Sequence, residues 1–174
     1  MNGGFPLRVG SSRAAQPQLE SVAVSWLPVR FAHPEHFDLP TGHHPRPIRA
    51  SDVEIDYPAV MGSRERLWSL YGDAWGWPPT TMTVEQDRDD LARHEREIEA
   101  HESFNYALLD AAETELLGCV YIDPPAEDDD PADAVVSWWV VDHAAGTEVE
   151  QALDDLVPEW LATTWPFDHV RFGT

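Results

Sequence analysis

Residues 104–122 read FNYALLDAAETELLGCVYI, and this stretch decides the fold. Its first six residues alternate as in a strand, residues 111–114 are of turn type, and residues 115–122 return as a second apolar run. Two such runs joined by a short polar segment are typical of a β-hairpin. Residues 134–141, AVVSWWVV, predict a third strand that is apolar on both faces and therefore lies inside the sheet.

Two helices are expected before the hairpin. From 53 to 71 apolar residues recur at mostly three- and four-residue spacing, and Pro58 falls in the first turns, where it costs least. From 83 to 101, apolar residues seven apart give a narrow stripe on an otherwise charged helix. Residues 46–49 predict a strand before the first helix, and residues 72–79 predict a turn-rich loop between the two helices.

The remaining segments frame this core. After the third strand, a helix is expected from Thr147 to about Leu156, where Pro158 must kink or restart it, and then a short strand at 169–172. Residues 1–20 are expected to be a flexible leader. Residues 21–43 are expected to be an extended segment that holds a short edge strand or clasp, and residues 44–174 the folded domain.

Composition excludes several classes of protein. The 174 residues suit one domain, and 32 acidic against 11 basic residues, all of them Arg, give a formal charge of -21. Such a surface repels nucleic acids and anionic membranes, so neither is an expected partner. Apolar runs are too short to cross a bilayer, no secretory signal is recognisable, and the single Cys119 excludes an intramolecular disulfide. A cytoplasmic protein is therefore expected.

The order of strand, two helices, three strands, helix and strand resembles the GNAT superfamily of N-acetyltransferases, including a set of bacterial proteins placed in it. Residues 46–52, RPIRASD, are similar to the opening strand and helix of the family, and residues 116–122, LLGCVYI, to its third strand. Residues 137–142, SWWVVD, resemble the fourth strand, whose end splays to admit the pantetheine arm of the cofactor. The resemblance covers about residues 44–174. It implies an α/β fold with a mixed, mostly antiparallel central sheet flanked by helices, shortened at its C-terminal end.

The same resemblance implies a site for acetyl-CoA. The backbone of the fourth strand would grip pantetheine, the following loop would hold the pyrophosphate, and a carboxylate would take the proton of the attacking amine. The pantetheine residues would be Trp139, Val140 and Val141, the pyrophosphate residues Gly146 and Thr147, and the candidate bases Asp142, Glu148 and Asp123.

The loop departs from the family pattern of Arg/Gln-x-x-Gly-x-Gly/Ala. Residues 143–150 read HAAGTEVE, with one glycine and two carboxylates where phosphate should lie. A capping box is expected in which the side chains of Thr147 and Glu150 each accept from the other's backbone N–H. Arg171 is the one basic residue that follows Arg96, so no local cation cluster is expected for a phosphate.

The second departure lies after the fifth strand, where the family usually continues with a helix that often carries a proton-donating Tyr. The sequence ends at Thr174. The outer edge of that strand is then expected to need a cover, either a homodimer partner or the segment around residues 22–31.

An aromatic pocket is the best candidate for a ligand site. It would take a small cationic or amine-bearing molecule through cation–π and carboxylate contacts. Its residues would be Tyr57, Trp75, Trp77 and Tyr121, with Asp123 nearby. Histidines in the loop before the domain have two interpretations, as metal ligands or as solvated side chains. The sequence favours solvated side chains, and no metal is predicted. These histidines are His33, His36, His43 and His44.

The sequence is compatible with two functions. One is an acyl-CoA-dependent N-acetyltransferase that acts on a small amine-bearing acceptor, which predicts affinity for acetyl-CoA. The other is a non-catalytic GNAT-fold module for binding or dimerisation, which predicts no such affinity and a stable homodimer.

Overall fold

The computed structural model describes residues 26–126 and 130–173. The expected leader at 1–20 and the first residues of the extended segment lie outside this part of the chain. In chain order the elements are β1 (His44–Pro47), η1 (Ala50–Asp52), α1 (Val53–Gly62), α2 (Arg64–Trp75), α3 (Val84–Ala100), β2 (Phe104–Leu109), β3 (Leu116–Asp123), β4 (Ala134–Val140), α4 (Glu148–Thr164) and β5 (Val170–Phe172).

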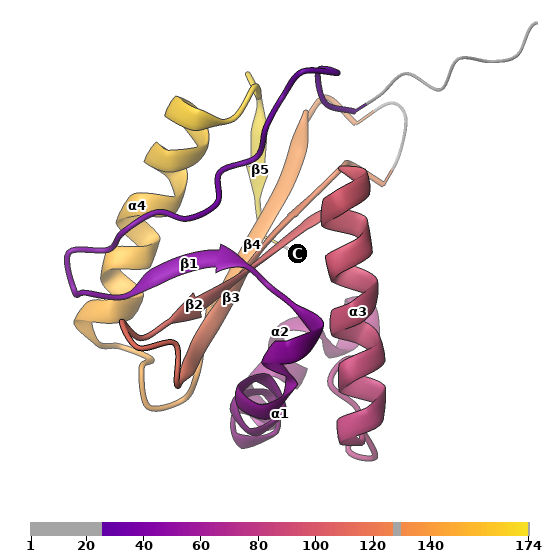
Figure 1. Ribbon diagram of the computed structural model, residues 1–174, viewed down its shortest axis with the longest axis vertical. Helices are drawn as coiled ribbons and strands as arrows, with labels where there is room; N and C mark the ends of the chain where they lie inside the picture. Colours follow the sequence, from indigo (N-terminus) through magenta and orange to yellow (C-terminus); the bar gives the residue numbers. More distant parts are fainter. Residues whose placement is uncertain (1–25, 127–129, 174) are drawn as a thin grey trace, which may run out of the picture.

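The five strands form one sheet in the order β1-β2-β3-β4-β5. Every pair is antiparallel except β4 and β5, which run parallel and pair only over residues 134–136 and 170–172. The predicted mixed, mostly antiparallel sheet with flanking helices is confirmed. In Figure 1, α4 covers one face of the sheet, and α1, α2 and α3 lie on the other.

Close packing inside the sheet explains Gly118 on β3. It lies opposite Val140 on β4, and a Cβ added there would stand 2.0 Å from the carbonyl oxygen of Trp139. Glycine removes this clash and lets the two central strands approach each other.

The first predicted helix is divided. α1 ends at Gly62, and α2 begins at Arg64 and runs on to Trp75, four residues into the predicted loop. At the break, Ser63 is 2% exposed, and its hydroxyl accepts a hydrogen bond from the backbone N–H of Asp142 at 3.0 Å. The apolar spacing predicted the helical residues correctly and gave no sign of this break, because the partner of Ser63 lies 79 residues away.

α4 also differs from the prediction. It continues through Pro158 to Thr164, so the predicted end near Leu156 is wrong, and of the kink or restart expected at Pro158 the restart does not occur. Proline removes one helical hydrogen bond. Val157, Trp160 and Leu161 are nevertheless buried in the core around Pro158, and this packing holds the helix together.

Val22 and Val24, on which the expected edge strand or clasp depends, lie outside the described residues, and residues 26–43 contain no strand. This segment runs beside α4 (Figure 1), and the hydroxyl of Tyr106 on β2 donates to the carbonyl oxygen of Pro34 at 2.9 Å. The indole N–H of Trp26 donates to the carbonyl oxygen of Asp133 at 2.7 Å, and the ring of Phe37 stacks on Trp160 at 4.3 Å. No backbone hydrogen bond joins residues 26–43 to β5 in the described structure. A homodimer that covers β5 stays a prediction. None of the helices described combines the length and apolarity that a membrane span requires.

Candidate functional site

β4 and β5 pair over three residues, up to Val136 and Phe172, and the described residues after β5 end with Gly173. Beyond Val136, no strand lies beside the outer edge of β4 in the described part of the chain, and this stretch is the open edge of β4. The N–H of Gly173 donates to Val136 on one side of β4 at 2.9 Å, and the N–H of Val141 donates to Leu117 on the other side at 2.8 Å. Backbone groups along a strand alternate between its two edges. The backbone groups of Trp138 and Val140 therefore point away from β3, toward the side on which β5 lies.

A cation from α2 reaches this edge. Arg66 donates from Nη1 to the carbonyl oxygen of Val140 at 2.5 Å and from Nη2 to Oε1 of Glu150 at 2.6 Å. The other carboxylate oxygen of Glu150 accepts from the N–H of Gly146 at 2.6 Å. The Gly146 N–H, and after it Arg66, lower the pKa of Glu150. The carboxylate thus occupies an anion position between a backbone amide and a guanidinium.

The predicted capping box at the start of α4 is wrong, because Thr147 and Glu150 form hydrogen bonds with other backbone groups than each other's. The hydroxyl of Thr147 accepts from Val149 at 3.3 Å and donates to the carbonyl oxygen of Ala144 at 2.6 Å. The Glu150 carboxylate reaches the N–H of Gly146 in place of that of Thr147. The tight turn at Gly146, whose φ is 72°, presents this N–H to the carboxylate. The sequence predicted no cation cluster close to the loop along the chain, and tertiary packing brings one cation, Arg66, to it from α2.

These donors fit an anion, and Glu150 already supplies one. A pyrophosphate that used the Gly146 N–H and Arg66 would have to displace the carboxylate. The backbone groups of the three predicted pantetheine residues do not all face the same edge of β4. Val140 faces the open edge, whereas Val141 donates to β3 and Trp139 lies opposite Cys119 in the β3–β4 ladder. Trp138, which was not predicted, shares the open edge with Val140.

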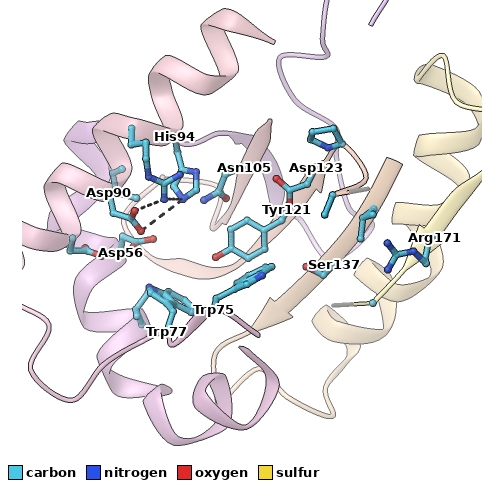
Figure 2. Close-up of a pocket in the computed structure, with 18 residues that line it drawn as sticks. Asp56, Trp75, Trp77, Asp90, His94, Asn105, Tyr121, Asp123, Ser137 and Arg171 are labelled. Carbon is cyan, nitrogen blue, oxygen red and sulfur yellow. Dashed lines mark hydrogen bonds and ion pairs between the residues drawn. The ribbon is translucent and has the colours of Figure 1, made fainter. Parts of the chain in front are cut away.

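A cavity of about 600 Å³ lies between the sheet and the helices α1, α2 and α3 (Figure 2). Its lining carries carboxyl groups, aromatic rings and a few apolar side chains, and it includes Ser137 and Gly173 just after the last paired residues of β4 and β5. The lining also includes Asp56, Val60, Trp75, Trp77, Asp87, Asp90, Leu91, Arg93, His94, Asn105, Tyr121, Asp123 and Arg171.

Two buried acceptors of this lining have no N–H donor beside them. They are Oδ1 of Asn105 and Oδ2 of Asp87, whose carboxyl group shares a hydrogen bond with that of Asp56. Asp87 and Asn105 are each only 3% exposed. Nδ1 of His94 lies 3.3 Å from Oε2 of Glu97. Burying a polar atom without a partner costs about 1–3 kcal/mol, and a ligand that donates hydrogen bonds would supply the missing contacts.

Burial dominates the titration of the carboxyl groups here. It raises the pKa of Asp56 well above its ordinary value, and the neighbouring Asp87 raises it further. Burial also raises the pKa of Asp87 to about 6, although its hydrogen bond with Asp56 acts in the opposite direction. At the far end of β3, burial and then the charge of Glu97 raise the pKa of Asp123 to about 6. Near neutral pH, Asp87 and Asp123 are largely ionised, whereas burial favours the neutral form of Asp56.

The arginines of the lining have other partners. Arg93 forms an ion pair with Glu97 at 2.8 Å and another with Asp90. Arg171 forms an ion pair with Asp130 at 2.8 Å. The imidazole of His94 has a pKa that burial lowers, so it contributes little positive charge. Asp87 and Asp123 therefore keep much of their negative potential for a ligand.

The cavity brings together four of the residues expected in the aromatic pocket: Trp75, Trp77, Tyr121 and Asp123. Tyr57 does not line it, and its hydroxyl donates to the carbonyl oxygen of Met82 at 3.1 Å.

The other two candidate bases lie elsewhere. Asp142 lines a second cavity with Ser63 and His143, and Glu148 is exposed at the start of α4. Asp123 is the one of the three that meets the aromatic residues.

Sequence reasoning missed Asp56, Asp87 and Asn105, although the pattern held a signal for each. Asp87 lies between Val84 and Leu91, on the face that carries the apolar stripe of α3. Asp56 lies likewise three residues after Val53, and Asn105 interrupts an apolar strand. A polar residue at a core position is a reason to look for a site. Arg66 had no such signal, since its partners lie 74 and 84 residues away.

The loop histidines are dispersed in the structure. His33 contacts His101 through ring nitrogens 3.1 Å apart, and His44 contacts Glu113 at 3.1 Å. Over residues 26–126 and 130–173, no three His, Cys, Asp or Glu side chains converge in the way a metal ion needs.

The sequence matches no family model, and no curated protein matches it. Solved structures do match in three dimensions. The ribosomal-protein-S5-alanine acetyltransferase from Vibrio fischeri superposes with a TM-score of 0.55 at 17% identity, over 72% of this chain and 66% of that one. RimL, a ribosomal L7/L12 α-N-protein acetyltransferase in complex with coenzyme A, gives a TM-score of 0.57 at 17% identity, over 72% and 67%.

The chain has the GNAT fold. A third GNAT structure, FdhC, a nucleotide-linked sugar GNAT, matches with a TM-score of 0.50 at 13% identity, over 78% of this chain and 71% of that one. The matched regions of these GNAT neighbours span about two thirds of their length. At such identities the likeness shows the fold, and the chemistry has to be argued from the residues.

Proposed function

We propose that this chain is an acyl-CoA-dependent N-acyltransferase whose acceptor amine binds in the cavity between the sheet and α1–α3. One observation carries the proposal. The cavity lining includes Ser137, so the cavity lies next to the residues at the open edge of β4, Trp138 and Val140, whose backbone groups point away from β3. An amine in the cavity and a thioester at that edge would lie next to each other.

Asp123 is the proposed general base. It is the one sequence-predicted base that lines the cavity, and its pKa of about 6 leaves it ionised at neutral pH while it still accepts a proton readily. It would take a proton from the ammonium or from the attacking amine, directly or through water. Acyl-CoA would supply the thioester carbonyl, and the amine nitrogen would form the new bond to carbon as the carbon–sulfur bond breaks.

The edge of β4 and the Gly146 loop are the proposed acyl-CoA side. The backbone groups of Trp138 and Val140 would face the pantetheine arm. Arg66 and the Gly146 N–H would bind the phosphates, in the place where they now bind Glu150. Cofactor binding is then a competition between phosphate and an internal carboxylate.

That competition also favours a second candidate, an amine-binding module without catalysis. If Glu150 cannot be displaced, the cavity still binds its ligand and no acyl transfer follows. The two candidates differ only in the behaviour of the Gly146 loop.

Calorimetric titration with acetyl-CoA separates the two candidates. We expect wild-type protein to bind weakly and Glu150→Gln to bind at least about tenfold more tightly, a difference of about 1.4 kcal/mol. Glu148→Gln is the matched control, since it removes one carboxylate from the same helix start without touching Arg66. Release of free thiol from acetyl-CoA in the presence of amines then tests catalysis. If neither wild type nor Glu150→Gln binds acetyl-CoA, the enzyme is excluded and the binding module remains.

A further inference from the structure

The ligand cavity has two acidic ends. Asp56 and Asp87 mark one end, where α1 and α3 meet, and Asp123 at the end of β3 marks the other. In Figure 2, Asp56 and Asp123 lie on opposite sides of the Tyr121 side chain, and Asn105 lies between Asp123 and His94. Asn105 faces Tyr121 across the β2–β3 ladder, so Asp123 is its diagonal neighbour, with Cα atoms about 7–8 Å apart.

The inner end is built for a hydrogen-bond donor. Oδ2 of Asp87, on a carboxyl group that shares a hydrogen bond with Asp56, and Oδ1 of Asn105 are acceptors that no N–H group reaches. Both side chains are 3% exposed. A carboxylate can only accept, and an ammonium group supplies three donors with one positive charge. No anionic or acceptor-rich ligand would satisfy these two oxygens.

The space between the ends is aromatic and apolar. Trp75 stacks on Tyr71 at 4.6 Å and meets the ring of Tyr121 edge-on at 5.6 Å. Trp77, Val60 and Leu91 complete this wall. A hydrocarbon linker buries its surface against such side chains, and the ring faces add a cation–π attraction for ammonium groups.

We propose that the cavity binds a diamine, with one ammonium group at Asp87 and Asn105, the second at Asp123, and the alkyl linker along Tyr121 and Trp75. The linker would have roughly four to six carbon atoms, on the order of the 7–8 Å between diagonal neighbours such as Asn105 and Asp123. The inference deepens the proposed function by giving the chemical class of its acceptor, and only its catalytic consequence rests on that function. The amine near Asp123 would be the one acylated.

The test is a binding series without acetyl-CoA. α,ω-Diaminoalkanes of increasing chain length are titrated into the full-length protein, each beside the n-alkylamine of equal length, and tryptophan fluorescence is followed together with heat. We expect a diamine to bind at least about tenfold more tightly than its monoamine, with an optimum at an intermediate length. Titration at about 0.15 M salt screens general attraction to the acidic surface.

Three variants make the result specific. Asp123→Asn should reduce diamine affinity at least about tenfold, to the level of the monoamine, and leave the monoamine unchanged. Asn105→Leu should weaken both ligands. Glu85→Gln is the matched control, because Glu85 is an exposed carboxylate on α3 that does not line the cavity. It should change the affinity for neither the diamine nor the monoamine. Circular dichroism verifies that each variant is folded.

The proposal is overturned if monoamines and diamines bind equally, if no chain length is preferred, or if Glu85→Gln weakens binding as much as Asp123→Asn. That last result would mean nonspecific attraction to a chain of charge -21. Thiol release is measured separately. Tight diamine binding without acyl transfer would refute the acyltransferase activity and support the diamine site. Acyl transfer to monoamines alone would support the acyltransferase activity and refute the diamine site.

Discussion

Arg66 and Glu150 lie 84 residues apart, and their side chains meet at 2.6 Å. Arg66 also donates to the carbonyl oxygen of Val140, while Glu150 also accepts from the N–H of Gly146. One guanidinium therefore ties α2 to the open edge of β4 and to the loop that begins α4. In a GNAT fold this places an internal carboxylate where the proposed function requires a phosphate.

The first prediction concerns the role of Arg66 once Glu150 is neutralised. The gain in acetyl-CoA affinity expected for Glu150→Gln should disappear in the double variant Arg66→Ala, Glu150→Gln, because the phosphate then lacks its guanidinium partner. Calorimetry on the single and double variants measures this coupling. An equal gain in both proteins would show that the phosphate does not use Arg66.

The second prediction is a pH-dependent stability effect of Asp87. Its pKa is about 6 in the folded protein and near 3.8 when unfolded, so the folded state binds more protons between these values. Its contribution to stability is present below about pH 4 and is lost as the pH rises through about 6. Asp87→Asn should therefore raise the melting temperature by several degrees at about pH 7.5 and change it little at about pH 4. Asp89→Asn, an exposed neighbour, is the control, and an equal shift at both pH values would contradict the assignment.

The third prediction tests the proposed base. The rate of thiol release under limiting amine should rise with pH through about 6, the pKa of Asp123, because only the carboxylate accepts the proton. Asp123→Asn should lower the rate by about 10²–10⁴-fold and remove this limb of the profile. Retention of the limb in the variant would assign the base to another group.

The fourth prediction concerns a buried ion pair at the start of the domain. Arg46 on β1 forms two hydrogen bonds with Asp52, at 2.8 and 2.9 Å, and both residues are 6% exposed. Arg46→Met leaves a buried carboxylate without its partner and should lower the free energy of unfolding by about 3–5 kcal/mol in urea denaturation. Arg88→Ala removes an exposed pair with Glu54 at 3.6 Å and should cost less than about 1 kcal/mol. Similar losses in the two variants would mean that burial does not set the strength of the pair.

The fifth prediction compares two glycines. Gly118→Ala brings a Cβ against the Trp139 carbonyl oxygen on the neighbouring strand and should destabilise the fold by more than about 2 kcal/mol. Gly62→Ala, in α1 with open space around its Cα, should be neutral or stabilise by up to about 1 kcal/mol. Thermal melts of the two variants give the comparison, and a tolerant Gly118→Ala would show that β3 and β4 can separate slightly.

Several elements were predictable because their cause is local. α3 begins where Thr83 accepts from Gln86 at 3.2 Å and Gln86 returns the contact at 2.9 Å, and both partners lie within one turn of the chain. The β2–β3 hairpin follows from two apolar runs and the turn between them, where Asp110 accepts from the N–H groups of Thr114 and Glu115. The hairpin was predicted to within a residue or two at each boundary.

The amino-acid sequence by itself determined most of the strands and helices and their order, since periodicity and turn chemistry operate over a few residues. The resemblance to the GNAT family implied the mixed sheet. Only the tertiary structure decided which polar groups meet. Asp56 and Asp87 come from different helices, Asn105 from a strand, and Arg66 finds Glu150 across 84 residues. The energy of each of these groups depends on burial and on a partner far along the chain, and neither is encoded in its neighbours in the sequence.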